Sequence, residues 1–401
     1  MNIRRIITFA SVLAIVVLAI GLSSCDRVPS MMPDPETPPM EETPPMADEG
    51  ITIGVALALT GGNAEPYGIP MQEGLELARE EINMLGGPSI TFVTEDALST
   101  VEGAKAAVQK LVDQGVPAIV GIGISTHLEQ AFPIAQDAGV IAFSPISSAA
   151  GLSSLGDYIF RAGLAVNILN PIGLEITQAT LGYTKVATIH DAADTYSTSS
   201  NAEIVKALEA GGIQILAQET FQTDDTDFMT QLTNIMNLDP QPEALFISAL
   251  STEMVEVIKQ GRAAGIPDSV HFIVPDLTIT EVQAAGDAAE GTITVSGWSA
   301  GSDAPGNQAF VQNYQAKYGS EPLPWAAQAY ATLHILANAI MKAESTDAAM
   351  IRDALAMTMD LDTILGKFSF DPNGEAMYDR VRERVVHIVK DGQLQPFGEE
   401  E

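Results

Sequence analysis

The sequence predicts an α/β protein with two doubly wound, parallel-sheet lobes, and three observations lead to this prediction. Short apolar runs alternate with helical patterns along most of the chain, which is typical of parallel sheets with helices on both faces. The alternation occurs in two successive series, and 401 residues fit two lobes better than one. Because 46% of the residues are apolar and 18% are charged, the chain can bury a substantial core.

The charge and the cysteine content exclude several classes of function. The chain has 52 Asp and Glu residues against 19 Lys and Arg, which gives a net charge of -33 at pH 7. This excess repels phosphate backbones and anionic headgroups, so we expect no nucleic acid partner. The single cysteine excludes an internal disulfide framework, and five scattered histidines without a second thiol match no common zinc motif. We therefore expect no metal and no cofactor.

The N-terminus has the pattern of an export signal. Arg4 and Arg5 precede an apolar run at 6–22, which is shorter than a comfortable membrane span. The run ends in Leu-Ser-Ser-Cys, which resembles the lipobox of bacterial lipoproteins and implies a signal peptide at 1–24 and a lipid on Cys25. A plain signal peptide and a single-span anchor with an incidental cysteine are the alternatives. Each of them places the rest of the chain outside the cytoplasm.

Residues 25–50 are predicted to form a tether. From residue 26 to residue 50 the chain has seven prolines, seven acids and one base, and Glu-Thr-Pro-Pro-Met occurs at 36–40 and again at 42–46. This composition cannot build a core. Because X-Pro bonds favour polyproline II and the acidic side chains repel one another, we expect a solvated, semi-rigid spacer between a lipid anchor and a folded body.

The folded body begins with the first series of alternating elements. An apolar run at 51–59 is followed by a helical pattern at 71–85, which Gly86-Gly87-Pro88 terminates. The series continues with strands at 90–95, 118–121 and 140–144 and helices at 102–114 and 127–138.

The second series has the same character. We expect helices at 167–181, 201–210, 228–236 and 252–264, and strands at 185–190, 213–219, 244–248 and 270–274. Four helix starts show Ser or Thr followed three residues later by Glu, which is the spacing of a capping box. These pairs are Ser99 with Glu102, Thr126 with Glu129, Ser200 with Glu203 and Thr278 with Glu281.

The last third of the chain departs from this alternation. An apolar run at 291–296 is followed by helical patterns at 308–318, 326–342 and 348–357. Segments 368–370 and 382–390 are predicted as strands, with a turn at 371–374 and a final hairpin closed by Asp391-Gly392.

Several short strings, in this order and spacing, resemble the branched-chain amino acid binding proteins of ABC transporters. They cover nearly all of 51–392 and consist of 54–59 with Thr60-Gly61-Gly62, Pro66-Tyr67-Gly68, 74–78, 81–83 with Gly86-Gly87, 121–125, Phe143-Ser144-Pro145, Phe160-Arg161, His190-Asp191 with Tyr196, and 261–265. The resemblance implies the type I periplasmic binding fold, in which two lobes joined by three crossing strands close on a ligand by hinge bending.

The resemblance also implies domains, ligands and partners. With crossings near 165, 297 and 369, lobe 1 comprises 51–165 plus 297–368 and lobe 2 comprises 166–296 plus 369–401. The ligands of the family are mostly leucine, isoleucine and valine, and relatives take other amino acids, aromatic acids, amides or urea. The implied partners are the permease and ATPase subunits of an ABC transporter, and the implied state is a monomer held at the membrane by its lipid.

The segment Gly121-Ile122-Gly123-Ile124-Ser125-Thr126 joins a predicted strand to a helix. Free N–H groups at a helix start form a seat for a carboxylate, and the hydroxyls of Ser125 and Thr126 can add donors. The alternative is that Thr126 only caps the helix together with Glu129. The resemblance favours ligand binding, because Ser125 falls where the family has a ligand serine.

A second serine-rich loop, Ser144-Pro145-Ile146-Ser147-Ser148, follows the next strand. It lies at the carboxyl end, where open parallel sheets place ligands. Ser147 and Ser148 can bind either end of a zwitterion, or they are ordinary loop serines. Many relatives have small residues and a threonine here, so Ile146 and Ser148 depart from the family pattern and leave the pocket size open.

Asp276 follows a predicted strand and falls where relatives carry a functional Glu or Asp. The resemblance implies that it binds the ligand ammonium from the second lobe. An Asp in this place can also be a simple cap for the following helix.

Aromatic and apolar residues are predicted at the walls of the cleft. Tyr67 and Tyr196 match aromatic wall positions of the family, and Leu250 matches another wall that is often aromatic. Trp325 and Tyr330 can line the cleft, although helix packing is the favoured expectation for both. His127 lies close to the Ser125 loop in sequence and is expected to be a fringe contact or no contact.

Other functional classes find less support. No positioned nucleophile with a base, catalytic carboxylate pair or phosphate-binding loop is visible in the sequence, so we expect no enzyme. A sensory receptor of the same fold, for an amide, urea or an aromatic acid, is the stronger alternative. An adhesion or scaffold protein is the third, and it predicts no affinity for any small molecule.

Overall fold

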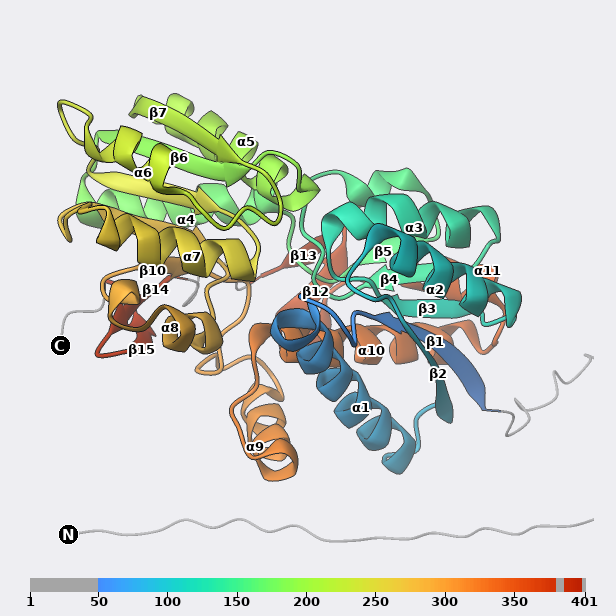
Figure 1. Ribbon diagram of the computed structural model, residues 1–401. Coiled ribbons are helices and arrows are strands. Elements are labelled where there is room, and N and C mark those ends of the chain that lie inside the picture. The colour runs from blue at the N-terminus through green and yellow to red at the C-terminus, as the bar shows by residue number, and fades with distance from the viewer. Residues whose placement is uncertain (1–49, 380–385, 399–401) are drawn as a thin grey trace, which may run out of the picture. The chain divides into compact units, whose positions relative to one another are not determined.

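The short apolar runs of the sequence form the strands of two mainly parallel sheets (Figure 1). The computed structural model describes residues 50–379 and 386–398, all of which belong to one compact unit. The predicted signal peptide, Cys25 and the tether up to residue 49 lie outside the described residues. Within the described ranges, no helix combines the length and the apolar character that crossing a membrane requires.

The first sheet has five parallel strands in the order β2-β1-β3-β4-β5. Its strands are β1 (Ile51–Leu57), β2 (Ile90–Asp96), β3 (Ala118–Gly121), β4 (Ile141–Ser144) and β5 (Ile159–Arg161). Every residue of β3, β4 and β5 is buried, as expected for strands covered on both faces.

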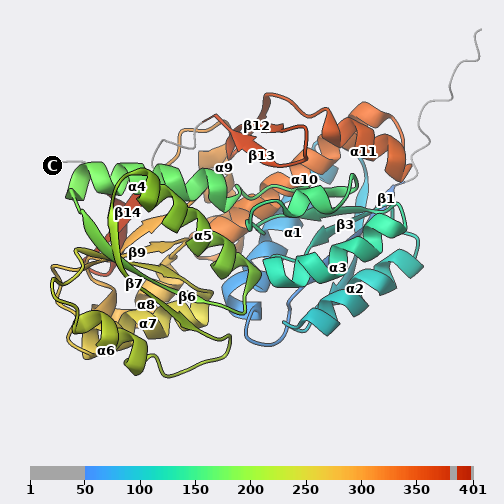
Figure 2. The same ribbon diagram turned by 90° about the horizontal axis from the view of Figure 1, so that it is seen from above.

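Helices cover both faces of this sheet, and together with the sheet they are called lobe 1 here. Figure 2 shows α2 and α3 on one side and α1 and α10 on the other. The bounds are α1 (Ile69–Met84), α2 (Val101–Asp113), α3 (Ser125–Asp137) and α10 (Pro324–Ala343), with the short helices η1 (Ala64–Gly68) and η2 (Leu152–Leu155) in the loops. Helices α1 and α10 approach closely because Gly74 has no side chain: a Cβ there would lie 2.1 Å from the Ala326 carbonyl oxygen.

The second sheet has seven strands in the order β15-β14-β10-β9-β8-β6-β7. Strands β6 (Lys185–Asp191), β7 (Gln214–Phe221), β8 (Ala244–Ser248), β9 (His271–Pro275) and β10 (Ile293–Val295) are parallel, whereas β14 (Val386–Lys390) and β15 (Gln393–Pro396) run antiparallel to their neighbours. The predicted final hairpin is thus confirmed.

Five helices accompany the second sheet, and this assembly is called lobe 2. They are α4 (Val166–Leu181), α5 (Thr195–Ala210), α6 (Met229–Met236), α7 (Ser251–Ala263) and α8 (Ile279–Ala285), followed by η3 (Gly286–Ala289). In α4, the buried residues Val166, Leu169, Ile172 and Gly173 fall on one face of the helix. This face packs toward the sheet: a Cβ on Gly173 would lie 2.5 Å from Val295 of β10.

The remaining elements form a small antiparallel sheet and two helices beside lobe 1. They are β11 (Leu361–Thr363), β12 (Gly366–Phe370), β13 (Ala376–Tyr378), α9 (Asn307–Tyr318) and α11 (Ala348–Ala356). Phe370 contacts Phe143 and Phe160 of the first sheet, with ring centroids 5.9 and 5.2 Å away. Residue 369, the expected third crossing, lies inside β12, and the chain joins the second sheet only after Tyr378.

The predicted fold class is confirmed, but only one of the four predicted capping boxes is. Thr278 and Glu281 form the expected box at α8. Helix α2 is capped by Thr100 rather than Ser99, and α3 begins at Ser125, with Ile124 at the cap position and Thr126 already inside the helix. Helix α5 is capped by Asp194, six residues before the expected Ser200. The spacing alone misleads because Ser and Thr also occur in loops and inside helices, where their hydroxyls bond elsewhere; Ser99, for example, donates to the Thr60 carbonyl oxygen.

Candidate ligand-binding site

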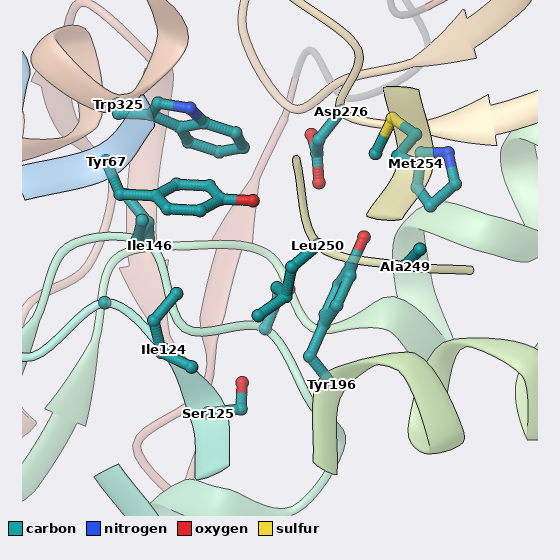
Figure 3. A pocket seen from close by; sticks show the side chains of 13 residues that line it. Tyr67, Ile124, Ser125, Ile146, Tyr196, Ala249, Leu250, Met254, Asp276 and Trp325 are labelled. Carbon is teal, nitrogen blue, oxygen red and sulfur yellow. The ribbon is translucent and has the colours of Figure 1, made fainter. Parts of the chain in front are cut away.

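A pocket lies between the two lobes and encloses about 410 Å³ that protein atoms do not fill, open solvent included (Figure 3). Its lining comes from η1, from the ends of β3, β4, β8 and β9 with the loops that follow them, and from the starts of α3, α5, α7 and α10. The lining residues are Tyr67, Gly123, Ile124, Ser125, Ile146, Ser148, Tyr196, Ala249, Leu250, Met254, Pro275, Asp276 and Trp325. The carboxyl ends of parallel strands therefore position the site, as in other open α/β sheets.

Neutral donors form the lobe 1 end of the pocket, which we call the serine end: Ser125 and Ser148 line the pocket, and Ser147 supports Ser125 from behind. Ser125 is the first residue of α3 and is 2% exposed, and its Oγ lies 2.9 Å from the Oγ of Ser147 and accepts a hydrogen bond from the Ala149 amide at 3.3 Å. The first-turn amides of α3 have no acceptor within the helix. This end can therefore bind an anion such as a carboxylate without any basic side chain.

A buried arginine supports the serine end from behind. Arg161 is completely buried, and its guanidinium donates to the carbonyl oxygens of Ser147 at 3.1 Å and Ala149 at 2.6 Å. It also donates to the Ser153 hydroxyl and forms an ion pair with Glu375. The loop that carries Ser147 and Ser148 is thus held by a cation that lies outside the pocket lining.

Asp276 forms the lobe 2 end of the pocket, which we call the aspartate end. It has φ +57°, and its amide donates to the Val295 carbonyl oxygen at 2.8 Å. Burial, together with the negative charge of Glu281, raises the pKa of Asp276 to about 7, and a hydrogen bond from Ser296 opposes this shift. No ion pair in the described part of the chain includes Asp276. A carboxylate held in this way favours a cationic ligand group.

Two tyrosines lie between these ends, and their hydroxyls extend into the pocket in Figure 3. The Tyr67 hydroxyl, from lobe 1, accepts a hydrogen bond at 2.8 Å from the amide of Ser251 in lobe 2. Burial and the charge of Glu281 raise the pKa of Tyr67, and burial and the charge of Asp276 raise the pKa of Tyr196. Both phenols therefore stay neutral and can serve as donors.

Apolar side chains close the rest of the pocket. Ile124, Ile146, Leu250 and Met254 line it together with Trp325, whose ring centroid lies 5.7 Å from that of Tyr67. Trp325, for which helix packing is the favoured expectation from sequence, therefore lines the pocket. Its indole Nε1 is buried and has no partner among the described residues. These walls suit an apolar ligand side chain.

The structure brings seven of the nine predicted site residues to the pocket lining: Tyr67, Ser125, Ile146, Ser148, Tyr196, Leu250 and Asp276. Ser147 lies behind Ser125 and does not line the pocket. Thr126 does not line it either; its hydroxyl donates to Asp194 of lobe 2 at 2.7 Å, so it neither faces the pocket nor caps α3.

The two remaining candidates also lie outside the pocket lining. His127 is partly buried on α3, and burial lowers its pKa. Tyr330 of α10 packs against Phe310 of α9, with ring centroids 4.6 Å apart, and its hydroxyl donates to Glu81 of α1 at 2.5 Å. The expectation of helix packing is thus confirmed for Tyr330.

Sequence reasoning missed five lining residues: Gly123, Ile124, Ala249, Met254 and Pro275. Four of them lie within two residues of a predicted residue at the same sheet edge, so the rule that ligands bind at carboxyl strand ends could have found them. Met254 lies one helical turn after Leu250, and residues four apart share a helix face.

Comparison with known proteins agrees with this geometry. Residues 50–392 match the family described as periplasmic binding protein. The leucine-, isoleucine-, valine-, threonine- and alanine-binding protein of Pseudomonas aeruginosa is 27% identical over 332 residues, which cover 81% of this chain and 87% of that protein.

Two solved structures have similar folds. A leucine binding protein from Thermotoga maritima superposes with a TM-score of 0.79 at 25% identity, covering 86% of this chain and 97% of that one. The branched-chain amino acid transporter substrate binding protein from Streptococcus pneumoniae, in complex with isoleucine, has a TM-score of 0.78 at 28% identity, covering 86% of this chain and 98% of that one. These proteins are named for binding and not for catalysis. The chain, with its two sheets and the pocket between them, belongs to the extracytoplasmic periplasmic binding protein family.

Proposed function

We propose that the chain captures an α-amino acid with a small apolar side chain, of the branched-chain type, and delivers it to the permease of an ABC transporter. The observation that carries the proposal is the partly buried Asp276, which has no cationic partner among the described residues and lies in the same pocket as the neutral serine end. A zwitterion between two apolar walls matches this distribution of charge.

Each part of such a ligand has a counterpart in the pocket. The ammonium group binds the Asp276 carboxylate, with which it forms a charge-assisted hydrogen bond. The carboxylate binds the α3 amides and the Ser125 and Ser148 hydroxyls, which line the pocket at the opposite lobe. The side chain packs against Ile124, Ile146 and the neighbouring apolar walls. The similarity to proteins named for leucine and isoleucine binding supports the branched-chain class.

The proposed setting is the outer face of a membrane. A lipid on Cys25 and the tether at 25–50 would hold a monomeric body there, within reach of the permease and ATPase subunits. We further propose that the two lobes move relative to each other about the crossings, and that β12 and β13 move with lobe 1, because Phe370 packs against the first sheet. Stronger binding of the ligand to the closed arrangement then drives closure, and the permease recognises the closed surface.

A thermal-shift screen of the full-length chain tests the ligand class, because a ligand that binds only the native state raises the melting temperature. The panel contains amino acids, small amides, urea and aromatic acids. Stabilisation by leucine, isoleucine or valine supports the proposal. A response to another compound class alone rejects the amino acid and retains a binding function, and no response at all favours a protein partner.

Asp276→Ala tests the role of the aspartate end. The substitution removes the only carboxylate among the described residues that line the pocket, and we expect it to weaken amino acid binding by about 2 kcal/mol or more. Isothermal titration calorimetry with the ligand found in the screen measures this change. An unchanged affinity would remove Asp276 from the proposed site.

A further inference from the structure

The start of α3 in lobe 1 is hydrogen-bonded to the start of α5 in lobe 2, outside the pocket lining. The Thr126 hydroxyl donates to Asp194 Oδ1 at 2.7 Å and accepts from the Thr195 amide at 2.8 Å. The Thr195 hydroxyl donates to Glu129 at 3.0 Å. We call these four residues, Thr126, Glu129, Asp194 and Thr195, the latch. None of them lines the ligand pocket.

The latch is built on a rigid support in lobe 2. Asp194 caps α5 and is 3% exposed, and its second oxygen accepts from both the amide and the hydroxyl of Ser197 at 2.8 Å. The carboxylate therefore keeps its position whether or not Thr126 is present. Thr126 uses its hydroxyl fully, as a donor and as an acceptor, across the gap between the lobes.

Two further hydrogen bonds cross between the lobes at other points. The Ala150 amide donates to the Ser199 hydroxyl at 2.9 Å, and the Ser251 amide donates to the Tyr67 hydroxyl at 2.8 Å. These bonds share no residue with the latch. Their amide protons are therefore independent reporters of whether the lobes are together.

We propose that Thr126 and Asp194 set ligand affinity by stabilising the closed arrangement of the lobes, without touching the ligand. This inference rests on the proposed function, since it assumes that the lobes close on a ligand. The latch bonds can form only when α3 and α5 are in contact. They therefore contribute free energy to the closed state alone, and ligand affinity falls in proportion when they are lost.

Thr126→Val is the first test, because valine keeps the shape of threonine and removes both hydrogen bonds. If the variant loses about 1.4 kcal/mol of the free energy that stabilises the closed arrangement, its ligand binds about tenfold more weakly. Since the latch does not contact the ligand, the same factor should apply to every ligand. We would titrate the full-length variant with two amino acids that stabilise the wild type and differ in side chain.

Amide hydrogen exchange in the ligand complex provides the second readout. If the latch holds the lobes together, Thr126→Val should speed exchange about tenfold at Ala150 and Ser251, whose own partners are unchanged. If the substitution removes only the local hydrogen bonds of Thr126, exchange should become faster at the Thr195 amide alone. The exchange measurement can use the complex with any compound that stabilises the protein, or the free protein if no compound does. If no amino acid binds, the proposed function is rejected, and the exchange measurement still tests the latch.

Three variants complete the design. Thr126→Ser keeps the hydroxyl and should restore wild-type affinity. Thr180→Val is the matched control, since Thr180 is exposed on α4 and donates only to its own helix, at the Ile176 carbonyl oxygen. Ser199→Ala removes a different bond between the lobes and should speed exchange at Thr195, even if Thr126→Val fails to fold.

The proposal has two ways to fail. Unequal factors for the two ligands would show that Thr126 contacts the ligand directly. Unchanged affinity, together with unchanged exchange at Ala150 and Ser251, would show that the latch does not contribute to closure.

Discussion

The serine end and the aspartate end of the pocket are both polar, but the first consists of neutral hydrogen-bonding groups and the second of a carboxylate. At the serine end, the hydroxyls of Ser125 and Ser147 bond to each other, the Ala149 amide bonds to Ser125, and Arg161 holds the loop from behind. At the aspartate end, the partly buried carboxylate of Asp276 lies near a second, buried carboxylate, Glu281, and has a serine hydroxyl as its hydrogen-bond donor. The hydroxyls of Ser125 and Ser147 therefore have hydrogen-bond partners within the protein, whereas the aspartate end lacks a counter-charge among the described residues.

This difference teaches where binding free energy should arise. A neutral, prearranged end changes little when a ligand carboxylate arrives, so each of its hydrogen bonds contributes modestly. A partly buried carboxylate such as Asp276 gains more from a cation, because it has lost part of its hydration and has no cationic partner among the described residues. The charge that stabilises the serine end lies outside the pocket, in the ion pair of Arg161 with Glu375.

The largest expected effect is on stability and concerns that ion pair. Arg161→Met leaves Glu375 without its partner and frees the carbonyl oxygens of Ser147 and Ala149, which are buried. We expect the free energy of unfolding to fall by about 3 kcal/mol, the usual cost of breaking a buried pair from one side. Urea denaturation of the free protein measures this loss.

Arg79→Met is the matched control for that measurement. Arg79 pairs with Glu76 one helical turn away, and both side chains are partly exposed. Exposed pairs contribute less than about 1 kcal/mol, so the control should differ little from the wild type. Equal losses in the two variants would show that the serine end does not depend on a buried cation.

The second effect is a pH dependence that only the aspartate end should produce. With a pKa of about 7, Asp276 is mostly protonated at pH 5 in the free protein. Binding of an ammonium group must then release this proton, so amino acid affinity should be about hundredfold weaker at pH 5 than at pH 8. Calorimetry across this range, in buffers of different ionisation enthalpy, measures both the affinity and the proton release.

The stability of the free protein should respond to pH with the opposite sign. The folded pKa of Asp276 is raised above the ordinary value of 3.8, so between about 4 and 7 the folded state binds the additional proton. The contribution of Asp276 to stability is therefore complete below pH 4 and is lost as the pH rises through 7. Asp276→Asn should abolish this contribution and the pH dependence of affinity together. A slope that persists in the variant would assign the titration to another group.

The fold and most of the pocket can be predicted from the sequence for a physical reason. Parallel strands are recognisable as apolar runs, and their carboxyl ends meet at one edge of their sheet, so the loops containing Ser125 and Ser148 can be placed together from the sequence alone. Asp276 follows a strand of the second sheet, and only the family resemblance places it opposite these serines. Capping is harder to predict. The Ser200 spacing suggests a helix start, whereas Asp194 accepts the Ser197 amide and begins α5 earlier.

Contacts between the lobes cannot be predicted from local patterns. The local pattern assigns Thr126 to the ligand or to a cap, and its actual partners, Asp194 and Thr195, lie almost 70 residues away in sequence. Arg161 and Glu375 are 214 residues apart, although their segments both belong to the lobe 1 side of the molecule. Such pairs depend on how distant segments are placed in space, and hydrophobic periodicity carries no information about that.

The smallest expected effect is at the serine end itself. Ser125→Ala removes one hydroxyl from a seat that keeps the α3 amides and Ser148, so binding should weaken by about 1 kcal/mol, or roughly fivefold. Ser154→Ala is the matched control, since Ser154 is exposed and donates only to the Gly151 carbonyl oxygen. A loss for Ser125→Ala as large as that for Asp276→Ala would contradict the asymmetry between the ends, because it would mean that the hydroxyl and not the α3 amides holds the ligand carboxylate.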